Sequence, residues 1–208
     1  MLQALYERHC LPSLLDCACG LGAIHKERAA IVPRAKGEVL EIGIGSGLNL
    51  SHYQAEQISR LCGLDPSPEL SAKARSRAKA SGLQVELLEL GAESIPAADH
   101  SFDSLVCTFT LCTIPEPMPA LAEMRRVLKP DGQLLFCEHG VAPSPSLARW
   151  QGRINRIWSP LAGGCRLDRD SPALLTAAGF RILELEQHHI PGPKPWTYIS
   201  RGVAVPAD

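Results

Sequence analysis

Apolar and polar residues alternate between two patterns along most of the chain, starting near residue 37. Short runs that are apolar almost throughout predict strands of a sheet covered on both faces, because such a strand has no polar side. Runs of this kind lie at 38–43, 58–65, 84–90, 104–110 and 132–139. Apolar residues at helical spacing, with capping and turn residues at the ends, predict helices at about 48–56, 68–81 and 117–128. This alternation predicts a doubly wound α/β fold with a mostly parallel, Rossmann-like sheet.

The C-terminal segment breaks this alternation. Two strand-like runs, FRILELEQHHI at 180–190 and TYISRGVAV at 197–205, are separated only by PGPKPW. A parallel pair needs a crossover of about a dozen residues or more, so we expect these strands to pair antiparallel. The predicted sheet therefore has seven strands and ends in an antiparallel hairpin.

The length of the chain favours one domain. Its 208 residues are enough for a substantial core and few for two domains. No internal repeat, low-complexity tract or clear boundary interrupts it. We predict a single domain over 1–208, with an N-terminal helical cap at 1–36, a ligand-binding core at 37–140, an insertion or lid at 143–172, and a helix with the terminal hairpin at 173–208.

Composition and charge narrow the class of protein. Apolar residues make up 45% of the chain and charged residues 21%, as in a soluble globular protein. The net charge of −1 gives no basic footprint for nucleic acid. The apolar N-terminus is interrupted by Glu7, Arg8 and Asp16, and it lacks the features of a signal peptide. We expect a cytoplasmic protein with no transmembrane segment, whose N-terminal helix can cover a cleft or contact a membrane surface.

The eight cysteines indicate free thiols. No CxxC pair occurs, which fits a reduced intracellular chain. Cys17 and Cys19 are separated by one residue, but no second His or Cys pair at zinc spacing follows. We therefore expect no metal site.

A glycine-rich loop follows the first predicted strand, in the stretch VLEIGIGSGLNL at 39–50. Gly43, Gly45 and Gly47 come where a strand gives way to a helix, and glycines there let the backbone approach a ligand closely. Asp65 ends the second predicted strand, 22 residues beyond Gly43. A carboxylate at that place can bind both hydroxyls of a ribose. Loop and acid together predict a nucleotide site.

Two neighbouring residues distinguish between nucleotides. Leu48 fills the position where a dinucleotide fingerprint has its third glycine. Glu41, two residues before the first glycine, would repel a pyrophosphate but suits a ligand with an ammonium or sulfonium group. S-adenosylmethionine carries both groups and a ribose for Asp65. It is the expected cofactor, with S-adenosylhomocysteine as product; NAD in an oxidoreductase is a rival.

Four segments occur in an order that resembles class I S-adenosylmethionine-dependent methyltransferases over about 37–140. They are the E-x-G-x-G-x-G loop, GLDPSPEL, GAESIPAADHSFDSLVC and MRRVLKPDGQLLFCEHG. The resemblance implies a methyltransferase and an acid near the adenine after the third strand, where Ala92 and Glu93 stand. The implied cofactor contacts are Glu41, Gly43, Gly45, Gly47, Asn49, Asp65, Pro66, Ala92, Glu93 and Thr108.

A closer resemblance concerns the methyl acceptor. The segments VCTFTLCTIPEP, LLFCEHG and AGGCRLDRD are similar to bacterial relatives of the methyltransferase-like proteins that methylate alkyl thiols, within the methyltransferase type 11 group. The resemblance implies a small-molecule acceptor, with a thiol first. Similar segments occur in phospholipid N-methyltransferases and in ubiquinone-menaquinone C-methyltransferases, which remain alternatives. A cofactor-binding module without an acceptor pocket is a more remote one.

Candidate catalytic residues come from the ends of the fourth and fifth strands, where ligands of open α/β sheets bind. Thr108 and Cys112 follow the fourth strand, and Glu138 and His139 end the fifth. His139 is the first choice for a general base, or it hydrogen-bonds backbone at a strand end. Cys112 is expected to pack, since methyl transfer needs no covalent intermediate. Glu138 either contacts substrate or anchors the N-terminal or insertion segment.

Two further segments are candidates for covering the site. Tyr6 and His9 lie on one face of the expected N-terminal helix and either close the pocket or form a surface pair. The charged run RLDRD at 166–170, in the insertion, is expected to tie the lid to the core rather than to bind a substrate.

Overall fold

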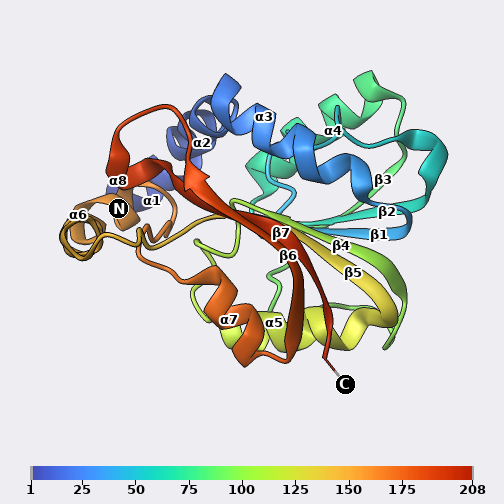
Figure 1. The fold of residues 1–208 in the computed structure, drawn as a ribbon. Coiled ribbons are helices and arrows are strands. Elements are labelled where there is room, and N and C mark those ends of the chain that lie inside the picture. Colours follow the sequence, from blue (N-terminus) through green and yellow to red (C-terminus); the bar gives the residue numbers. More distant parts are fainter. Residues whose placement is uncertain (1, 208) are drawn as a thin grey trace.

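A seven-stranded sheet forms the centre of the computed structural model, which describes residues 2–207 (Figure 1). The strand order is β3-β2-β1-β4-β5-β7-β6, with β7 antiparallel to both β5 and β6 and all other neighbours parallel. The predicted fold and its reversed hairpin are therefore confirmed. The strands are β1 (Gly37–Ile42), β2 (Ile58–Leu64), β3 (Val85–Leu88), β4 (Phe102–Thr108), β5 (Leu128–His139), β6 (Phe180–His189) and β7 (Tyr198–Pro206).

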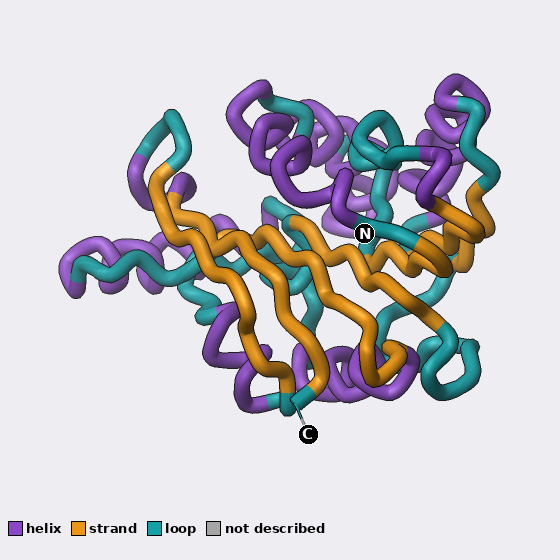
Figure 2. Tube along the Cα trace, turned by 45° about the vertical axis from the view of Figure 1, so that its right-hand side comes forward, coloured by secondary structure: helices purple, strands orange, loops and turns teal. Residues whose placement is uncertain are grey.

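Helices cover both faces of this sheet (Figure 2). They are α1 (Leu2–His9), α2 (Leu11–Cys19), α3 (Gly22–Ile31), α4 (Pro68–Ser81), α5 (Pro117–Val127), α6 (Pro145–Leu161), α7 (Ser171–Ala177) and α8 (Lys194–Thr197). One apolar cluster joins the sheet to α5 and α7, and a second joins its other face to α3 and α4. Among residues 2–207, no helix is long and apolar enough to cross a bilayer.

The apolar runs in the sequence follow from this two-sided packing. In β4, Leu105 and Cys107 belong to the cluster with α5, while Val106 between them belongs to the cluster with α3. All three are at most 1% exposed. Because neighbouring strand residues point to opposite faces, a strand covered on both sides needs apolar residues at every position.

The segment after the glycine loop differs from its prediction. No regular helix forms at 48–56; the chain makes successive turns and a short 3-10 helix, Ala55–Gln57. The turns are closed by bonds from Leu50 N–H to Gly47 O (3.2 Å) and from His52 N–H to Asn49 O (2.8 Å). The sequence NLSHYQ has few strong helix formers. Buried side-chain contacts of Asn49 and Tyr53 fix this segment instead.

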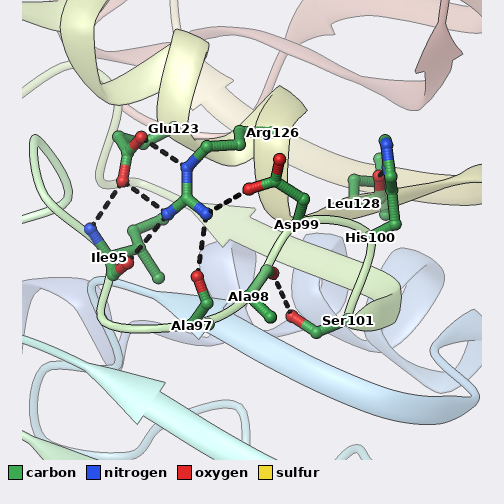
Figure 3. Close-up of polar contacts among 9 residues, drawn as sticks. All are labelled: Ile95, Ala97, Ala98, Asp99, His100, Ser101, Glu123, Arg126 and Leu128. Atoms are coloured by element: carbon green, nitrogen blue, oxygen red, sulfur yellow. Dashed lines mark hydrogen bonds and ion pairs between the residues drawn. The ribbon is translucent and has the colours of Figure 1, made fainter.

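An arginine of α5 fixes the loop between β3 and β4 (Figure 3). Arg126 donates to both oxygens of Glu123 (2.7 and 2.8 Å), to the carbonyls of Ile95 (2.9 Å) and Ala97 (2.8 Å), and to Asp99 (2.8 Å). Glu123 in turn accepts from the Ile95 N–H at 2.9 Å. Charge-assisted bonds to backbone are stronger than neutral ones. Arg126 therefore sets the path of the loop whose first residues reach the carboxyl end of the sheet.

Replacing Arg126 by alanine is expected to lower the free energy of unfolding by about 2 kcal/mol, because several charge-assisted bonds are lost and the loop carbonyls lose their donor. The matched control is Arg75→Ala. Within 2–207 Arg75 pairs only with Glu89, on the surface, so its replacement should cost about 0.5 kcal/mol or less. Urea unfolding measures both values. Equal small losses in the two variants would show that the network does not hold the loop.

Candidate functional site

A cavity of about 1050 Å³ opens at the carboxyl ends of β1, β2 and β4. Helices α1 and α2 and the C-terminal end of α6 line its other side. Open α/β sheets bind ligands at this edge. Single-ligand pockets measure roughly 300–1,000 Å³, so this cavity has room for a cofactor beside a small acceptor.

The three glycines of the loop serve different purposes. At Gly43 (φ +67°) an added Cβ would lie 2.2 Å from Cγ2 of Thr110, and at Gly47 (φ +80°) it would lie 3.1 Å from Cα of Ala74 in α4. At Gly45 (φ +54°) no atom outside the chain neighbours comes closer than 3.9 Å. Gly43 and Gly47 thus allow the protein to pack on itself. Gly45 is the glycine that leaves open space beside the cavity.

Asp65 faces the cavity at the end of β2. Its Oδ2 accepts the Gly45 N–H at 3.0 Å and its Oδ1 accepts the Ser67 N–H at 2.9 Å. Burial raises the pKa of this carboxyl, and the two amides oppose that shift. Each oxygen keeps a free lone pair for a ligand hydroxyl. The other predicted residues on this side, Pro66, Ala92 and Glu93, also line the cavity.

Glu41 and Asn49 lie behind the loop and not among the residues that line the cavity, which differs from the predicted cofactor contacts. Glu41 is 1% exposed, and its two oxygens accept from Asn49 Nδ2 (2.8 Å) and the Tyr53 hydroxyl (2.7 Å). Asn49 Nδ2 also donates to Thr108 Oγ1 at 2.9 Å. This geometry supports orientation of the loop by Glu41 rather than contact with the ligand.

Arg28 of α3 is the residue of this site that the sequence analysis missed. Its guanidinium donates to Asn49 Oδ1 (2.8 Å) and Thr108 Oγ1 (2.6 Å) and lies 5.1 Å from the ring centre of Phe109. Arg28 lines the cavity, is 6% exposed, and has a buried Nε with no partner among the residues that the structure describes. One signal was available, because Arg28 sits four residues after Ile24 on the buried face of α3. A charged residue within the apolar face of a helix is buried with that face, which indicates a role inside the protein.

The predicted acid at the end of β5 organises the loop after β4. Glu138 is fully buried and accepts the N–H groups of Thr110 (2.9 Å), Leu111 (2.9 Å) and Cys112 (3.2 Å). It does not line the cavity. The geometry therefore gives no support to contact between Glu138 and an acceptor. Its anchoring role concerns the loop after β4, not the N-terminal or insertion segment as predicted.

His139 also lies outside the lining of the cavity. Its ring packs edge-on against Phe109 at 5.1 Å, and it hydrogen-bonds the Trp196 backbone. Its Nδ1 is buried and has no partner. Burial lowers the pKa of His139 to about 4, so the ring is neutral at pH 7 and a weak base. This position favours the alternative of a hydrogen-bonded strand end over a general base.

Cys112 packs beneath the insertion, as expected for a small buried residue. Its Sγ lies 3.7 Å from Cys165 Sγ, and its carbonyl accepts the Arg166 N–H at 3.0 Å. Arg169 donates to the Ile114 carbonyl at 2.6 Å. The insertion is thus tied to the loop after β4. Six residues of that region line the cavity: Thr108, Phe109, Thr110, Thr113, Ile114 and Pro115.

The N-terminal helices close the cavity from the side. The Tyr6 hydroxyl donates to the Leu161 carbonyl at the end of α6. In α2, Asp16 accepts from Ser46 Oγ (2.6 Å) and from Arg77 (2.7 Å). Burial raises the pKa of Asp16, but the bonds from Arg77 and Ser46 outweigh it and hold the pKa at about 2. An ionised Asp16 therefore ties the cap to the glycine loop at neutral pH.

No cluster of three or more His, Cys, Asp or Glu side chains suited to a metal ion occurs within 2–207.

Replacing Glu41 by glutamine is expected to change how stability depends on pH. Burial raises the pKa of Glu41 to about 7 from 4.5, although Tyr53, Arg28 and Asn49 oppose the shift. Between these values the native state holds a proton that the unfolded chain has released. The free energy of unfolding of the wild type should therefore fall relative to Glu41→Gln as the pH rises from about 4.5 to 7, by on the order of 2–3 kcal/mol.

Urea unfolding of both proteins across this pH range measures the difference. The exposed carboxyl Glu56, replaced by glutamine, controls for the loss of one negative charge. Parallel pH profiles of the wild type and Glu41→Gln would contradict a protonation of Glu41 in this range.

Comparisons with known proteins agree with the fold. The model of the methyltransferase domain family matches residues 40–136. The chain is 36% identical over 168 residues to the human thiol S-methyltransferase TMT1B, covering 78% of this chain and 67% of that protein. It is 31% identical over 138 residues to a phosphatidylethanolamine N-methyltransferase of Cereibacter sphaeroides, covering 65% of this chain and 67% of that protein. The chain thus spans about two thirds of the length of these relatives.

A solved structure shows the same fold. The Burkholderia thailandensis 1,6-didemethyltoxoflavin-N1-methyltransferase, crystallised with 1,6-didemethyltoxoflavin and S-adenosylhomocysteine, superposes with a TM-score of 0.70 at 18% identity. The superposition covers 100% of this chain and 88% of that chain. With the family match and the identity to TMT1B, this shows that the chain belongs to the class I S-adenosylmethionine-dependent methyltransferases of the methyltransferase domain family.

Proposed function

We propose that the chain methylates the sulfur of a small thiol. The relative TMT1B carries that activity in its name, and the cavity wall after β4 supports it. The six wall residues there carry hydroxyl, aromatic and aliphatic side chains but no carboxylate or imidazole. This absence of a base beside the end of β4 is the observation that carries the proposal.

The reason lies in the ionisation of the acceptor. A free thiol has a pKa of about 8.5, so a few per cent is already the nucleophilic thiolate near pH 7. An amine acceptor needs a group that takes its proton, and a carbon acceptor needs a base that forms an enolate or phenolate. With His139 and Glu138 outside the cavity lining, a thiol is the acceptor that this wall serves best.

The residues of the cavity fit S-adenosylmethionine. Asp65 offers two partly free carboxylate oxygens to ribose hydroxyls, and Gly45 leaves open space beside its backbone. Ala92 and Glu93 form the wall next to Asp65, where the adenine would lie. The buried Nε of Arg28 lacks a partner and suits the carboxylate of the methionine end. When bound, this cofactor supplies a methyl group on a sulfonium sulfur.

The protein contributes positioning to the reaction. The thiolate sulfur of the acceptor forms a bond to the methyl carbon while the bond from that carbon to the sulfonium sulfur breaks. The thiol proton goes to solvent, and a thioether and S-adenosylhomocysteine result. Alignment of the reacting atoms can supply on the order of 7–11 kcal/mol of the barrier reduction. Thr108, held by Arg28 and Asn49, fixes the wall beside which the acceptor would lie.

A phospholipid amine is the second candidate, because of the relative from Cereibacter sphaeroides. A panel of alkyl thiols, amines, phosphatidylethanolamine and quinols, incubated with methyl-labelled S-adenosylmethionine, separates the classes. We expect labelled thioether from thiols. Label in phosphatidylethanolamine or in quinols alone would overturn the thiol proposal. Tight cofactor binding without transfer to any acceptor would indicate a binding module.

The pH dependence of kcat/KM tests more sharply whether a group on the protein takes the proton of the thiol. If the thiol ionises without help, kcat/KM should rise tenfold per pH unit below the acceptor's own pKa and level off above it. Two thiols whose pKa values differ by about one unit should then give profiles of kcat/KM against pH that are displaced by about one pH unit. A midpoint that stays fixed for both thiols would show that a group on the protein takes the proton.

Arg28→Met is expected to weaken binding of S-adenosylhomocysteine by roughly 10- to 100-fold, as for a lost charge-assisted bond. The control ligand is 5′-methylthioadenosine, which keeps the adenosine but has no amino-acid end. The affinity of the Arg28→Met variant for this control ligand should differ little from that of the wild type. Calorimetry measures the affinity of both ligands for the same variant. Equal losses for the two ligands would assign Arg28 to the protein's own packing instead of the carboxylate.

A further inference from the structure

Helix α6 presents an apolar and basic face to solvent. Trp150 is 57% exposed, Ile157 72% and Leu161 48%. These residues and three exposed arginines recur every three or four positions, so they share one side of the helix. The α6 surface comprises Arg149, Trp150, Arg153, Arg156, Ile157 and Leu161.

The opposite side of α6 is anchored by polar side chains. Gln151 is 1% exposed, accepts the Ala142 N–H at 2.9 Å and donates to the Gly140 carbonyl at 3.1 Å. Asn155 accepts the Leu167 N–H at 3.0 Å. A surface helix ordinarily buries its apolar stripe and exposes polar residues. In α6 the buried amides, together with Ile154 and Trp158, fix the helix to the protein. Trp150, Ile157 and Leu161 nevertheless face outward, and such an exposed patch marks a site of interaction.

The charges on this face have one sign. Helix α6 contains three arginines and no acidic residue. Within 2–207, no carboxylate forms an ion pair with Arg149, Arg153 or Arg156, although ten other arginines and lysines do form such pairs. The α6 surface is therefore an unneutralised basic patch around an apolar centre, on a chain whose net charge is −1.

We propose that the α6 surface docks on the headgroup region of a membrane that contains anionic lipids. Tryptophan favours this region because its ring is apolar and its N–H is polar, and isoleucine and leucine insert below it. Arginine lets its stem lie along the apolar layer while its charge stays at the lipid phosphates. A second copy of the chain is disfavoured, since two such faces would oppose like charges. Nucleic acid is disfavoured by the apolar centre.

The α6 surface adjoins the mouth of the cavity. Ser159, Pro160, Gly163 and Gly164 line that cavity at the end of α6. Helix α1 lies beside them, since Gln3 donates to the Pro160 carbonyl. In Figure 1, α6 and α1 lie together at the left, away from the helices above and below the sheet. Docking would bring the mouth to the lipid surface, where an apolar acceptor is concentrated; this consequence rests on the proposed function, while the docking itself does not.

In this proposal the membrane contact lies on α6 and not on the N-terminal helix, where the sequence led us to expect it. Leu5 of α1 is 50% exposed and extends the same side of the molecule, but α1 carries Glu7 as well as Arg8. The charge pattern that attracts anionic lipid is therefore on α6.

Co-sedimentation of the full chain with vesicles tests the docking. We expect binding to phosphatidylcholine vesicles containing phosphatidylglycerol, weaker binding in high salt, and little binding to phosphatidylcholine alone. Trp150→Ser with Ile157→Ser should abolish binding. Replacement of all three arginines by glutamine should lower the partition coefficient on the order of 100-fold, since each basic residue contributes about fivefold. Tryptophan emission should shift to the blue with vesicles.

The matched controls lie on β6. Leu183→Ser with Leu185→Ser removes side chains that are 50% and 42% exposed, and Arg181→Gln removes an exposed arginine; both should bind vesicles like the wild type. S-adenosylhomocysteine affinity in each variant checks the fold and separates a failed docking from a failed function. No binding to anionic vesicles, equal binding by the α6 and β6 variants, or a dimer that the α6 substitutions dissolve would overturn the proposal.

Discussion

The site depends on one buried cation. Arg28 reaches from α3 to Asn49 on the segment after the glycine loop and to Thr108 at the end of β4, so it joins these two segments beside the cavity. A buried charge is unfavourable unless it is paired. The nearby Glu41 is itself so deeply buried that its pKa rises to about 7. Neutralisation of Arg28 by the protein is therefore incomplete near neutral pH, and we propose that an anionic group of the ligand completes it.

The rest of the fold serves this arrangement. Two of the three loop glycines are required by contacts of the protein with itself, at Thr110 and at Ala74. Glu138 accepts hydrogen bonds from the amides that follow β4, so the loop after β4 keeps one conformation. Asp16 and Tyr6 then hold the cap on the loop and on α6. The cavity is thus enclosed by polar anchors, of which Glu138 and Tyr6 lie outside its lining while Asp16 is part of it.

The sequence predicted those features that local patterns determine. Apolar runs located the five parallel strands, and the short linker PGPKPW indicated the antiparallel hairpin. The helix expected at 48–56 was wrong, because side-chain bonds to Glu41 outweigh a weak helical preference there. Positions at strand ends suggested Glu138 and His139 as catalytic groups, but only the packed structure shows which way a strand-end side chain points. Arg28 was missed since its partners lie 21 and 80 residues away.

A crystal structure with S-adenosylhomocysteine tests the central claim most directly. The account expects the ligand carboxylate within hydrogen-bond distance of Arg28, the ribose hydroxyls on Asp65, the adenine beside Ala92 and Glu93, and the sulfur toward Thr108. A ligand in the opposite orientation, or a carboxylate held elsewhere while Arg28 contacts only Asn49 and Thr108, would contradict it.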